Sequence, residues 1–329
     1  MLEVIKGGID SVVEDWPGRL GHLDNGIAAA GAFDAVALGL ANVAVGNASG
    51  DAGLEIAGGY FEVRFDDDSI ICLGGSDMSP QLNGEPLPLW QAVTVTAGDE
   101  LKLSHFGEGG FRSYIAVAGG IDVPEYLGSK STCLSEGYGG FEGRRLRPGD
   151  RLIAGNHSDS LGSLEGRRIR ADKIPKYGRE YTVRAMPGPN SAPDYATEAG
   201  MDLLFSRSWK VLLNSNRTAC RLEEIPDPEE FFARKDGGVG GSHPSNVLDH
   251  AYATRGAMNV CGNTPIILIA DAPTLGGYMN ALHIIFADLW MTGQCVPGRD
   301  HLRFSCCTAD EAIEARGEQR RWLSEGSLV

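Results

Sequence analysis

The sequence predicts a mostly β protein with a few helices (the α+β class), divided into two domains. Glycine is abundant, at 45 of 329 residues, and stretches with the helical period are few. This combination favours short strands joined by tight turns. Between residues 60 and 118, short runs of alternating apolar and polar residues follow one another at hairpin-like spacing, which is typical of a β-barrel or a curled sheet. The length exceeds that of one small core, so a second domain is expected.

The first predicted domain covers residues 1–153. A strand is expected at 2–9, and apolar residues recur at spacings of three and four over 32–45, which predicts a helix. Asp34 falls in its first turn, where an acidic side chain complements the helix dipole. Further strands are predicted at 60–65, 69–73, 92–96, 101–104 and 112–118, and a closing strand near Leu152.

A Pro-Gly turn follows the first strand, with Asp15 just before it and Arg19 just after it. Arginine offers a planar pair of donors to a carboxylate or a similar anion. Asp15 and Arg19 are therefore candidate catalytic residues. The alternative is a structural turn that is closed by an ion pair between these two side chains.

The second predicted domain covers residues 179–329. It follows a polar, serine-containing segment, 154–178, which we assign to a linker. Thr308-Ala-Asp-Glu311 is a capping box that predicts a C-terminal helix running toward Trp322. Strands are predicted at 181–185, 209–213, 265–270 and 302–305.

This second domain is organised around residues 265–294. A run of apolar residues ends at Asp271, a turn with Pro273 and two glycines follows, and apolar residues then recur at helical spacing over 278–294. Free N–H groups at the start of such a helix suit an anion or a carbonyl that develops negative charge. Asp271 is therefore a candidate to carry protons or support the turn, and the candidate substrate-binding residues are Thr274, Gly276, Gly277 and Tyr278. The alternative is a core segment whose glycines serve geometry alone.

Composition and missing motifs exclude several functions. The net charge of −15 argues against nucleic acid and anionic membrane surfaces as partners. The start of the sequence has no apolar signal core, no apolar run is long enough to span a bilayer, and the seven cysteines form no C-x-x-C pair, so we expect a cytoplasmic protein. The histidines are scattered and predict no metal site.

The sequence contains no phosphate-binding loop, no G-x-S-x-G motif and no Met-Lys dipeptide of the kind that carries biotin. We therefore expect no cofactor on this chain and assign any ATP or biotin step to partner chains.

Many short motifs, in one order along the chain, resemble the carboxyltransferase-like family often labelled allophanate hydrolase subunit 2. This family includes the C-type subunit of 5-oxoprolinase, the kinase-inhibitor antagonist proteins and half of the carboxyltransferase domain of urea carboxylase. The sequence departs from the family pattern at Glu14, at 272–275 and at 214–218. The matching segments are 14–19, 31–34, 41–47, 54–56, 114–124, 127–132, 139–140, 276–278, 287–288, 294 and 297–298.

The resemblance implies two β-barrel-like domains, the second similar to cyclophilin, and a site shared with a second carboxyltransferase-like subunit, similar to the B-type subunit of 5-oxoprolinase. A lactam-utilisation protein is a further implied partner. Within the matching segments, Gly119, Gly120 and Gln294 are expected to contact the substrate, a small amide or lactam.

The first functional hypothesis is the C-type subunit of an ATP-dependent 5-oxoprolinase, which opens a cyclic amide to glutamate and is inactive alone. The second is half of a biotin-dependent carboxyltransferase that acts on urea or a similar amide. The third is a non-enzymatic regulator that binds a partner protein. The departures from the family pattern concern the substrate more than the fold.

Overall fold

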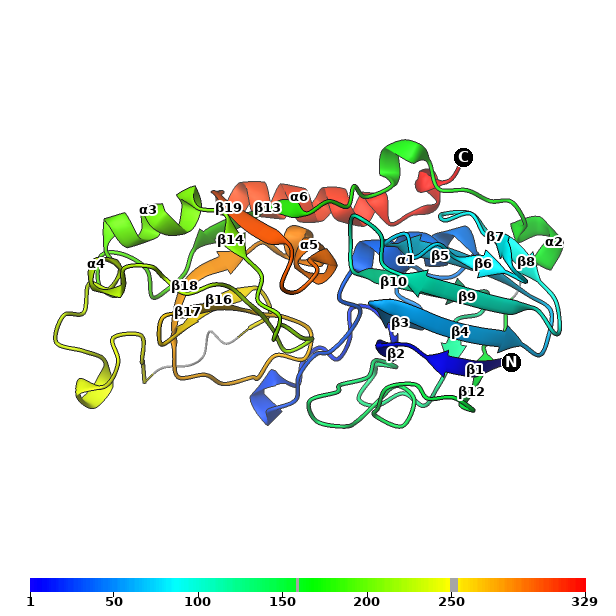
Figure 1. Cartoon of the computed structure of the whole chain (residues 1–329), viewed down its shortest axis with the longest axis horizontal. Coiled ribbons are helices and arrows are strands. Elements are labelled where there is room, and N and C mark those ends of the chain that lie inside the picture. The colour runs from blue at the N-terminus through cyan, green and yellow to red at the C-terminus, as the bar shows by residue number, and fades with distance from the viewer. Residues whose placement is uncertain (158–159, 249–253) are drawn as a thin grey trace. The chain divides into compact units, whose positions relative to one another are not determined.

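A computed structural model describes residues 1–157, 160–248 and 254–329 (Figure 1). The chain folds into two compact units. Unit 1 comprises Met1–Leu20, Ala30–Gly178 and Gly317–Val329, and unit 2 comprises Gly21–Ala29 and Arg179–Arg316. Strands predominate over helices in both units, which confirms the predicted mostly β class. The likeness of the second domain to cyclophilin stays a prediction.

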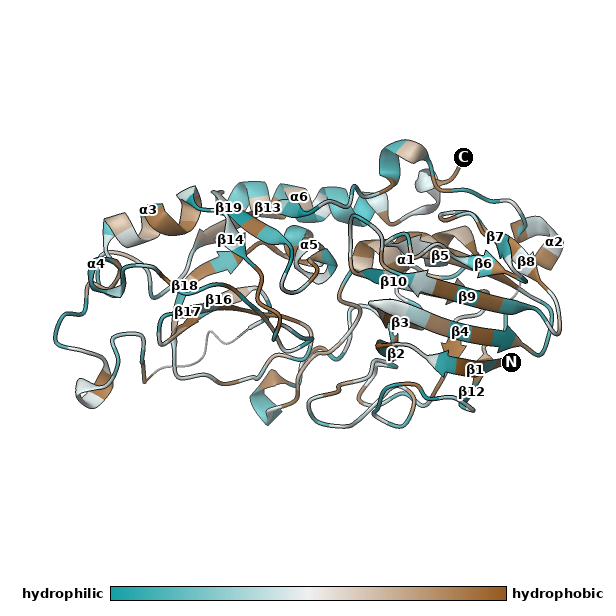
Figure 2. Cartoon of the chain, in the orientation of Figure 1, coloured by the Kyte–Doolittle hydropathy of each residue, from teal (hydrophilic) through white to brown (hydrophobic). Residues whose placement is uncertain are grey.

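Unit 1 contains a seven-stranded sheet. Its strands are β1 (Leu2–Gly7), β4 (Gly59–Phe65), β6 (Gln81–Leu82), β7 (Glu85–Pro86), β9 (Glu100–His105), β11 (Ile121–Asp122) and β12 (Arg151–Ala154). They are ordered β11-β12-β1-β4-β9-β6-β7, with antiparallel pairing. In β4, Phe61, Val63 and Phe65 are buried and the residues between them reach the surface, so the sheet has one buried face. Figure 2 shows brown, apolar segments along β4 and β9.

The second sheet of unit 1 has five strands: β2 (Asp10–Glu14), β3 (Gly53–Ala57), β5 (Ser69–Gly75), β8 (Val93–Val95) and β10 (Arg112–Val117). Their order is β2-β3-β10-β5-β8. Apolar side chains of both sheets, among them Phe61 and Ile115, form one continuous core. Full burial of a side chain of this size contributes about 1.5–3 kcal/mol, so this core is the main stabilising feature of unit 1.

Helix α1 (Ala35–Ala44) packs against β5 and β10, at the position predicted for a helix over 32–45. Asp34 is its N-cap, and the carboxylate accepts hydrogen bonds from the N–H groups of Val36 at 3.0 Å and Ala37 at 2.9 Å. Every residue of the helix is buried. The short α2 (Leu161–Leu164) also belongs to unit 1.

Unit 2 is built on a second seven-stranded sheet: β13 (Glu180–Pro187), β14 (Trp209–Lys210), β15 (Ala219–Arg221), β16 (Ala257–Cys261), β17 (Thr264–Leu268), β18 (Met279–Ile284) and β19 (His301–Cys306). The order is β14-β19-β13-β18-β16-β17-β15. Strands β13 and β19 pair in parallel, and the other recorded pairs are antiparallel. The predicted strand at 209–213 is limited to Trp209 and Lys210.

The helices of unit 2 are α3 (Glu198–Ser206), α4 (Pro228–Phe231), α5 (Leu289–Gln294) and the first part of α6 (Ala309–Trp322), which continues into unit 1. The predicted capping box at the start of α6 is confirmed. The Glu311 carboxylate accepts hydrogen bonds from the N–H and hydroxyl of Thr308, and the Glu311 N–H donates to the Thr308 hydroxyl at 3.2 Å. Short 3₁₀ turns lie at η1 (Leu23–Asn25), η2 (Ala171–Lys173), η3 (Val239–Gly241), η4 (Phe286–Asp288) and η5 (Glu325–Ser327).

The predicted helix over 278–294 is wrong for most of its length. The chain forms strand β18 up to Ile284, the 3₁₀ turn η4 next, and helix α5 only from Leu289. Strand β18 lies between β13 and β16 and is buried on both faces. A strand of this kind is apolar throughout, so periodicity cannot separate it from a buried helix. The glycine turn therefore leads directly into a strand and not into a helix.

The two units also differ from the predicted domain limits. Residues 154–178, predicted as a linker, belong to unit 1, where Leu164 and Ile169 are buried. Residues 21–29 belong to unit 2 and 317–329 to unit 1. Among the described helices, none combines the length and the hydropathy that crossing a lipid bilayer requires.

Candidate functional site

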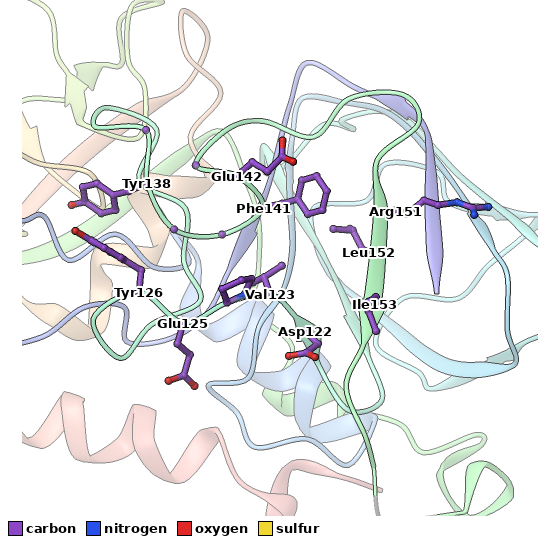
Figure 3. A pocket seen from close by; sticks show the side chains of 15 residues that line it. Asp122, Val123, Glu125, Tyr126, Tyr138, Phe141, Glu142, Arg151, Leu152 and Ile153 are labelled. Carbon is purple, nitrogen blue, oxygen red and sulfur yellow. The ribbon is translucent and has the colours of Figure 1, made fainter.

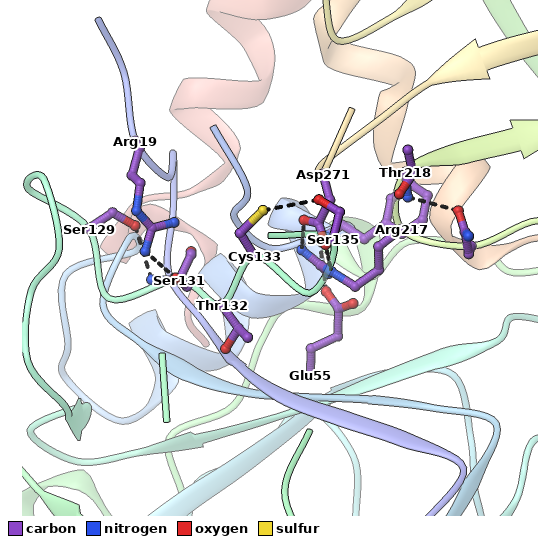
Figure 4. A network of polar contacts seen from close by, with 12 residues as sticks. Arg19, Glu55, Ser129, Ser131, Thr132, Cys133, Ser135, Arg217, Thr218 and Asp271 are labelled. Carbon is purple, nitrogen blue, oxygen red and sulfur yellow. Dashed lines mark hydrogen bonds and ion pairs between the residues drawn. The ribbon is translucent and has the colours of Figure 1, made fainter. Parts of the chain in front are cut away.

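Arg19 is held in the interior of unit 1 by the loop that follows β10 and β11. Only 1% of the residue is exposed. Its Nε donates to the carbonyl of Tyr126 at 3.0 Å, and its Nη2 donates to the carbonyl of Ser131 (Figure 4). The guanidinium lies 5.5 Å from the ring centre of Tyr126 and 5.0 Å from that of Tyr138, so two aromatic faces stabilise its charge.

The third guanidinium nitrogen of Arg19, Nη1, is buried and has no hydrogen-bond partner among the described residues. Within 1–157, 160–248 and 254–329, no carboxylate lies at ion-pair distance from Arg19. A buried donor without a partner costs about 1–3 kcal/mol, and more when it is charged. Arg19 therefore retains both an unneutralised charge and an unused donor, which is the arrangement that an anion-binding arginine requires.

Asp15 does not pair with Arg19. One carboxylate oxygen accepts from the hydroxyl of Ser129 at 2.8 Å and from that of Ser131 at 2.5 Å, and the other accepts from the N–H of Lys130 at 2.6 Å. The turn is therefore not closed by an ion pair between Asp15 and Arg19. Both side chains bind Ser131, and Asp15 fixes the loop that supplies a carbonyl to Arg19.

A cavity of about 540 Å³ lies next to this cluster in unit 1. It is lined by three segments, 122–126, 137–143 and 151–153 (Figure 3). Tyr126, Tyr138 and Gly139 belong to its wall and also surround Arg19. Burial, together with a hydrogen bond to Cys133, raises the pKa of Tyr138, so its hydroxyl stays protonated at neutral pH.

Gly119 and Gly120 form the turn between β10 and β11, outside the cavity wall. Both have left-handed φ angles, 87° and 70°. The Gly119 N–H donates to Asn47 Oδ1 at 2.8 Å, and a Cβ at Gly119 would overlap the carbonyl of Gly155. This close approach accounts for the glycine at 119 without a ligand.

In unit 2, Asp271 forms a buried ion pair with Arg217. Arg217 Nη2 lies 3.1 Å from Asp271 Oδ1 and Nε lies 3.3 Å from Oδ2 (Figure 4). The Asp271 N–H also donates to the Arg217 carbonyl at 3.0 Å. Both side chains are almost fully buried, at 3% and 1% exposure. This two-point geometry fixes the start of the loop that carries the other predicted residues.

Residues 272–278 form that loop. The Gly277 carbonyl accepts from Val247 N–H at 3.0 Å, and Tyr278 forms a β-bridge with Asn246. Tyr278 is 40% exposed, and a hydrogen bond to Cys261 raises its pKa. Thr274, Gly276 and Gly277 are partly exposed, so this loop presents four of the predicted binding residues at or near the surface of unit 2.

Gln294, the last residue of α5, is completely buried in unit 2. Its backbone carbonyl accepts from the Tyr181 hydroxyl at 3.5 Å. The structure thus brings Asp271, Thr274, Gly276, Gly277 and Tyr278 into one loop of unit 2, and Asp15 and Arg19 into one cluster of unit 1. In the part of the chain that the structure describes, no three His, Cys, Asp or Glu side chains are grouped to hold a metal ion.

Sequence reasoning missed Arg217, Tyr126, Ser131 and Tyr138 as site residues. Three of them lie in or beside segments that resemble the family, 127–132 and 139–140, but the resemblance gave them no role. Arg217 lies in 214–218, where the sequence departs from the family pattern. The available signal was a tyrosine directly before each of two glycine-containing segments.

Comparison with known proteins identifies the family. A family model described as the carboxyltransferase domain, subdomains A and B, matches residues 25–306. The chain belongs to this carboxyltransferase family. A putative urea carboxylase of Emericella nidulans is 37% identical over 98% of this chain and 26% of its own length. The C-type subunit of Escherichia coli 5-oxoprolinase is 34% identical over 99% of the chain and 97% of its own length.

The crystal structure of Kluyveromyces lactis urea carboxylase superposes on the whole chain with a TM-score of 0.91 at 33% identity, and the match covers 29% of that enzyme. The chain thus spans about a quarter of the length of the urea carboxylases that it matches. It is homologous both to the C-type subunit of 5-oxoprolinase and to a region of urea carboxylase, and identities of 34% and 37% do not separate these roles.

Proposed function

We propose that this carboxyltransferase chain acts as the C-type subunit of an ATP-dependent 5-oxoprolinase, as one part of a multi-subunit enzyme. The observation that carries the proposal is the extent of the match, which covers 97% of the Escherichia coli relative. Every large part of that relative has a counterpart here, whereas most of the length of the fungal urea carboxylases has none.

The proposed reaction adds water across the ring amide of 5-oxoproline. An oxygen nucleophile attacks the carbonyl carbon, the C–N bond breaks, the nitrogen takes a proton, and the carbonyl becomes the side-chain carboxylate of glutamate. ATP hydrolysis to ADP and phosphate drives this step on a partner chain. A developing negative charge on the carbonyl oxygen needs donors that are fixed in advance.

Two parts of the chain suit this chemistry. Arg19 offers a buried, unneutralised guanidinium beside a cavity in unit 1. In unit 2, the Arg217–Asp271 pair anchors the loop of Thr274, Gly276, Gly277 and Tyr278. We assign substrate contacts to this loop, whereas Gln294 is completely buried. Because both Asp271 oxygens are bound by Arg217, we assign Asp271 a positioning role in preference to proton transfer.

A second candidate is half of a biotin-dependent carboxyltransferase that acts on urea. It is favoured by the 37% identity to the Emericella nidulans protein and by the TM-score of 0.91 to the Kluyveromyces lactis enzyme. In that case biotin would be carried by a partner or another domain, and the substrate would carry no charge.

The test is reconstitution with the proteins encoded beside this chain. We expect the complex, and not the chain alone, to form glutamate from 5-oxoproline in an ATP-dependent reaction. ATP- and biotin-dependent carboxylation of urea by the complex would favour the second candidate and overturn the first. A complex that turns over neither substrate would overturn both enzymatic proposals. The remaining hypothesis would be a regulator that binds a partner protein.

A further inference from the structure

The cavity in unit 1 and the guanidinium of Arg19 share three neighbouring residues. Tyr126, Tyr138 and Gly139 contact the guanidinium on one side and line the cavity on the other. The two tyrosine rings lie together, with centres 5.1 Å apart, and Figure 3 shows them side by side at one end of the cavity. Arg19 Nη1 would therefore become accessible from the cavity if one ring moved.

Tyr126 is the more exposed of the two rings. It is 43% exposed and stands at the start of a tight turn closed by hydrogen bonds between Tyr126 and Ser129. Leu127 in this turn has a φ of 53°, a left-handed angle that a branched side chain rarely adopts, and is itself 40% exposed. Strained, exposed turns of this kind occur preferentially at ligand clamps and switch segments.

The charges around the cavity favour an anion at Arg19. Two wall carboxylates already have cationic partners, because Lys130 Nζ lies 3.1 Å from Asp122 and Arg144 Nη2 lies 2.6 Å from Glu142. Glu125 is exposed, and its side chain points away from the two tyrosine rings in Figure 3. Arg19, in contrast, donates hydrogen bonds to two neutral carbonyls and to no carboxylate among the described residues.

We propose that this cavity binds a small molecule that carries a carboxylate, and that the carboxylate accepts hydrogen bonds from Arg19 Nη1 once the Tyr126 ring swings aside. The apolar wall formed by Val123, Phe141 and Leu152 receives the body of the ligand. The inference rests on the proposed function and names its substrate class. The ligand is 5-oxoproline, which carries a carboxylate, whereas urea carries none.

The test uses the full chain labelled with 3-fluorotyrosine and ¹⁹F NMR, with the Tyr126 and Tyr138 signals assigned from Tyr126→Phe and Tyr138→Phe variants. We expect L-5-oxoproline to shift both signals in a saturable manner. Its uncharged ring analogue 2-pyrrolidinone, and urea, should leave both signals in place. Absence of a saturable shift with 5-oxoproline, or an equal shift with 2-pyrrolidinone, would overturn the inference, and this comparison needs no folded arginine variant.

A matched pair of variants tests the role of Arg19 itself. Arg19→Lys keeps the charge but loses the planar pair of donors, and it should weaken binding of 5-oxoproline roughly tenfold or more, as expected for a charged hydrogen bond. Arg145→Lys is the control, because Arg145 is exposed and pairs with Asp10 outside the cavity wall. Equal affinities of the two variants would overturn the assignment to Arg19.

The binding experiment and the reconstitution experiment test the two proposals independently. If the chain binds 5-oxoproline at the tyrosines but the complex carboxylates urea, the inference about the cavity stands and the proposed function falls. If the complex forms glutamate while neither tyrosine signal responds to 5-oxoproline, the proposed function stands and this inference falls.

Discussion

Gly139 determines how closely the chain can surround Arg19. Its φ is 70°, and an added Cβ would overlap both Arg19 Nη2 and the carbonyl of Ser131. We expect Gly139→Ala to lower the free energy of unfolding by about 2–5 kcal/mol, since a left-handed alanine costs roughly 1–2 kcal/mol and overpacking about 1–3 kcal/mol. Denaturation by urea measures this change.

Gly137→Ala is the matched control for that prediction. Gly137 lies in the same segment with a φ of 73°, but a Cβ added there meets no atom within 4 Å. This variant should lose only the backbone contribution of about 1–2 kcal/mol. If both variants lose the same free energy of unfolding, the overlap with Arg19 does not contribute to the destabilisation.

The Arg217–Asp271 pair offers a second test at single residues. Asp271→Ala removes a carboxylate that pairs with the buried Arg217 guanidinium, and breaking a buried pair in this way typically costs about 3–5 kcal/mol. Replacing both residues, as Arg217→Met with Asp271→Leu, should cost less than the single change because neither charge of the pair is left buried. Chemical denaturation of the three proteins decides this, and a double variant less stable than Asp271→Ala would contradict it.

Single residues of the site could be predicted from the sequence only in part. Asp15 and Arg19 were singled out because an acid, a turn and an arginine are adjacent in the chain. Their partners could not be, because the contacts of Arg19 with Tyr126 and Ser131 join residues that are 107 and 112 positions apart. No local pattern encodes a pairing over that distance.

Among the secondary-structure elements, the N-terminus of α6 gives a prediction with a clean control. Thr308→Ala removes the hydroxyl that accepts from the Glu311 N–H and should cost about 1 kcal/mol. Thr308→Ser keeps the hydroxyl and should restore most of this loss. Unfolding midpoints of the two variants and the parent provide the measurement, and a serine variant as unstable as the alanine variant would argue against the capping role.

Local signals explain which elements were predicted correctly. The capping box and the helical spacing around α1 are contained within a few residues, so the sequence alone reveals them. Strand β3 was missed because Glu55 interrupts its apolar run. Its carboxylate is buried and accepts from Phe33 N–H at 2.8 Å, the Tyr114 hydroxyl at 2.7 Å and Arg112 Nε at 3.2 Å. A buried glutamate is understandable only when these distant partners are known.

For the whole molecule, the buried Tyr114 predicts a loss of stability in alkali. Burial, together with the nearby Glu55 and Asp34 carboxylates, raises the pKa of Tyr114 well above its ordinary value of 10.0. A pKa raised by folding stabilises the protein below the unfolded-state value, and this contribution is lost as the pH rises beyond it. We therefore expect the free energy of unfolding to fall above about pH 10.

Tyr114→Phe separates this contribution from those of other tyrosines. The variant should be less stable than the parent at pH 8, because the hydroxyl donates to Glu55 and accepts from the Asp34 N–H at 2.7 Å. Above pH 10 its stability should decline less steeply than that of the parent. Parallel declines, measured by urea denaturation between pH 8 and pH 11, would contradict the prediction.

The extent of each unit was the feature of the whole molecule that the sequence revealed least. Residue 179, the predicted start of the second domain, is also where the long segment of unit 2 begins. Residues 21–29 belong to unit 2 and residues 317–329 to unit 1, and no change in amino-acid composition marks these crossings. The crossings depend on tertiary contacts such as the backbone hydrogen bonds from Arg170 to Ser327 and from Val329 to Arg168.

The same crossings have a consequence for biosynthesis. The chain passes between the units after residues 20, 29, 178 and 316. A ribosome therefore releases every residue of unit 2 before it releases the last segment of unit 1, although unit 1 is begun first. Until then, the nascent unit 1 lacks two contacts. Leu323 lies against Gly39 in α1, and Leu328 forms a β-bridge with Ile169. A fragment that ends at 178 would keep this gap permanently, so the two units are inseparable as products of simple truncation.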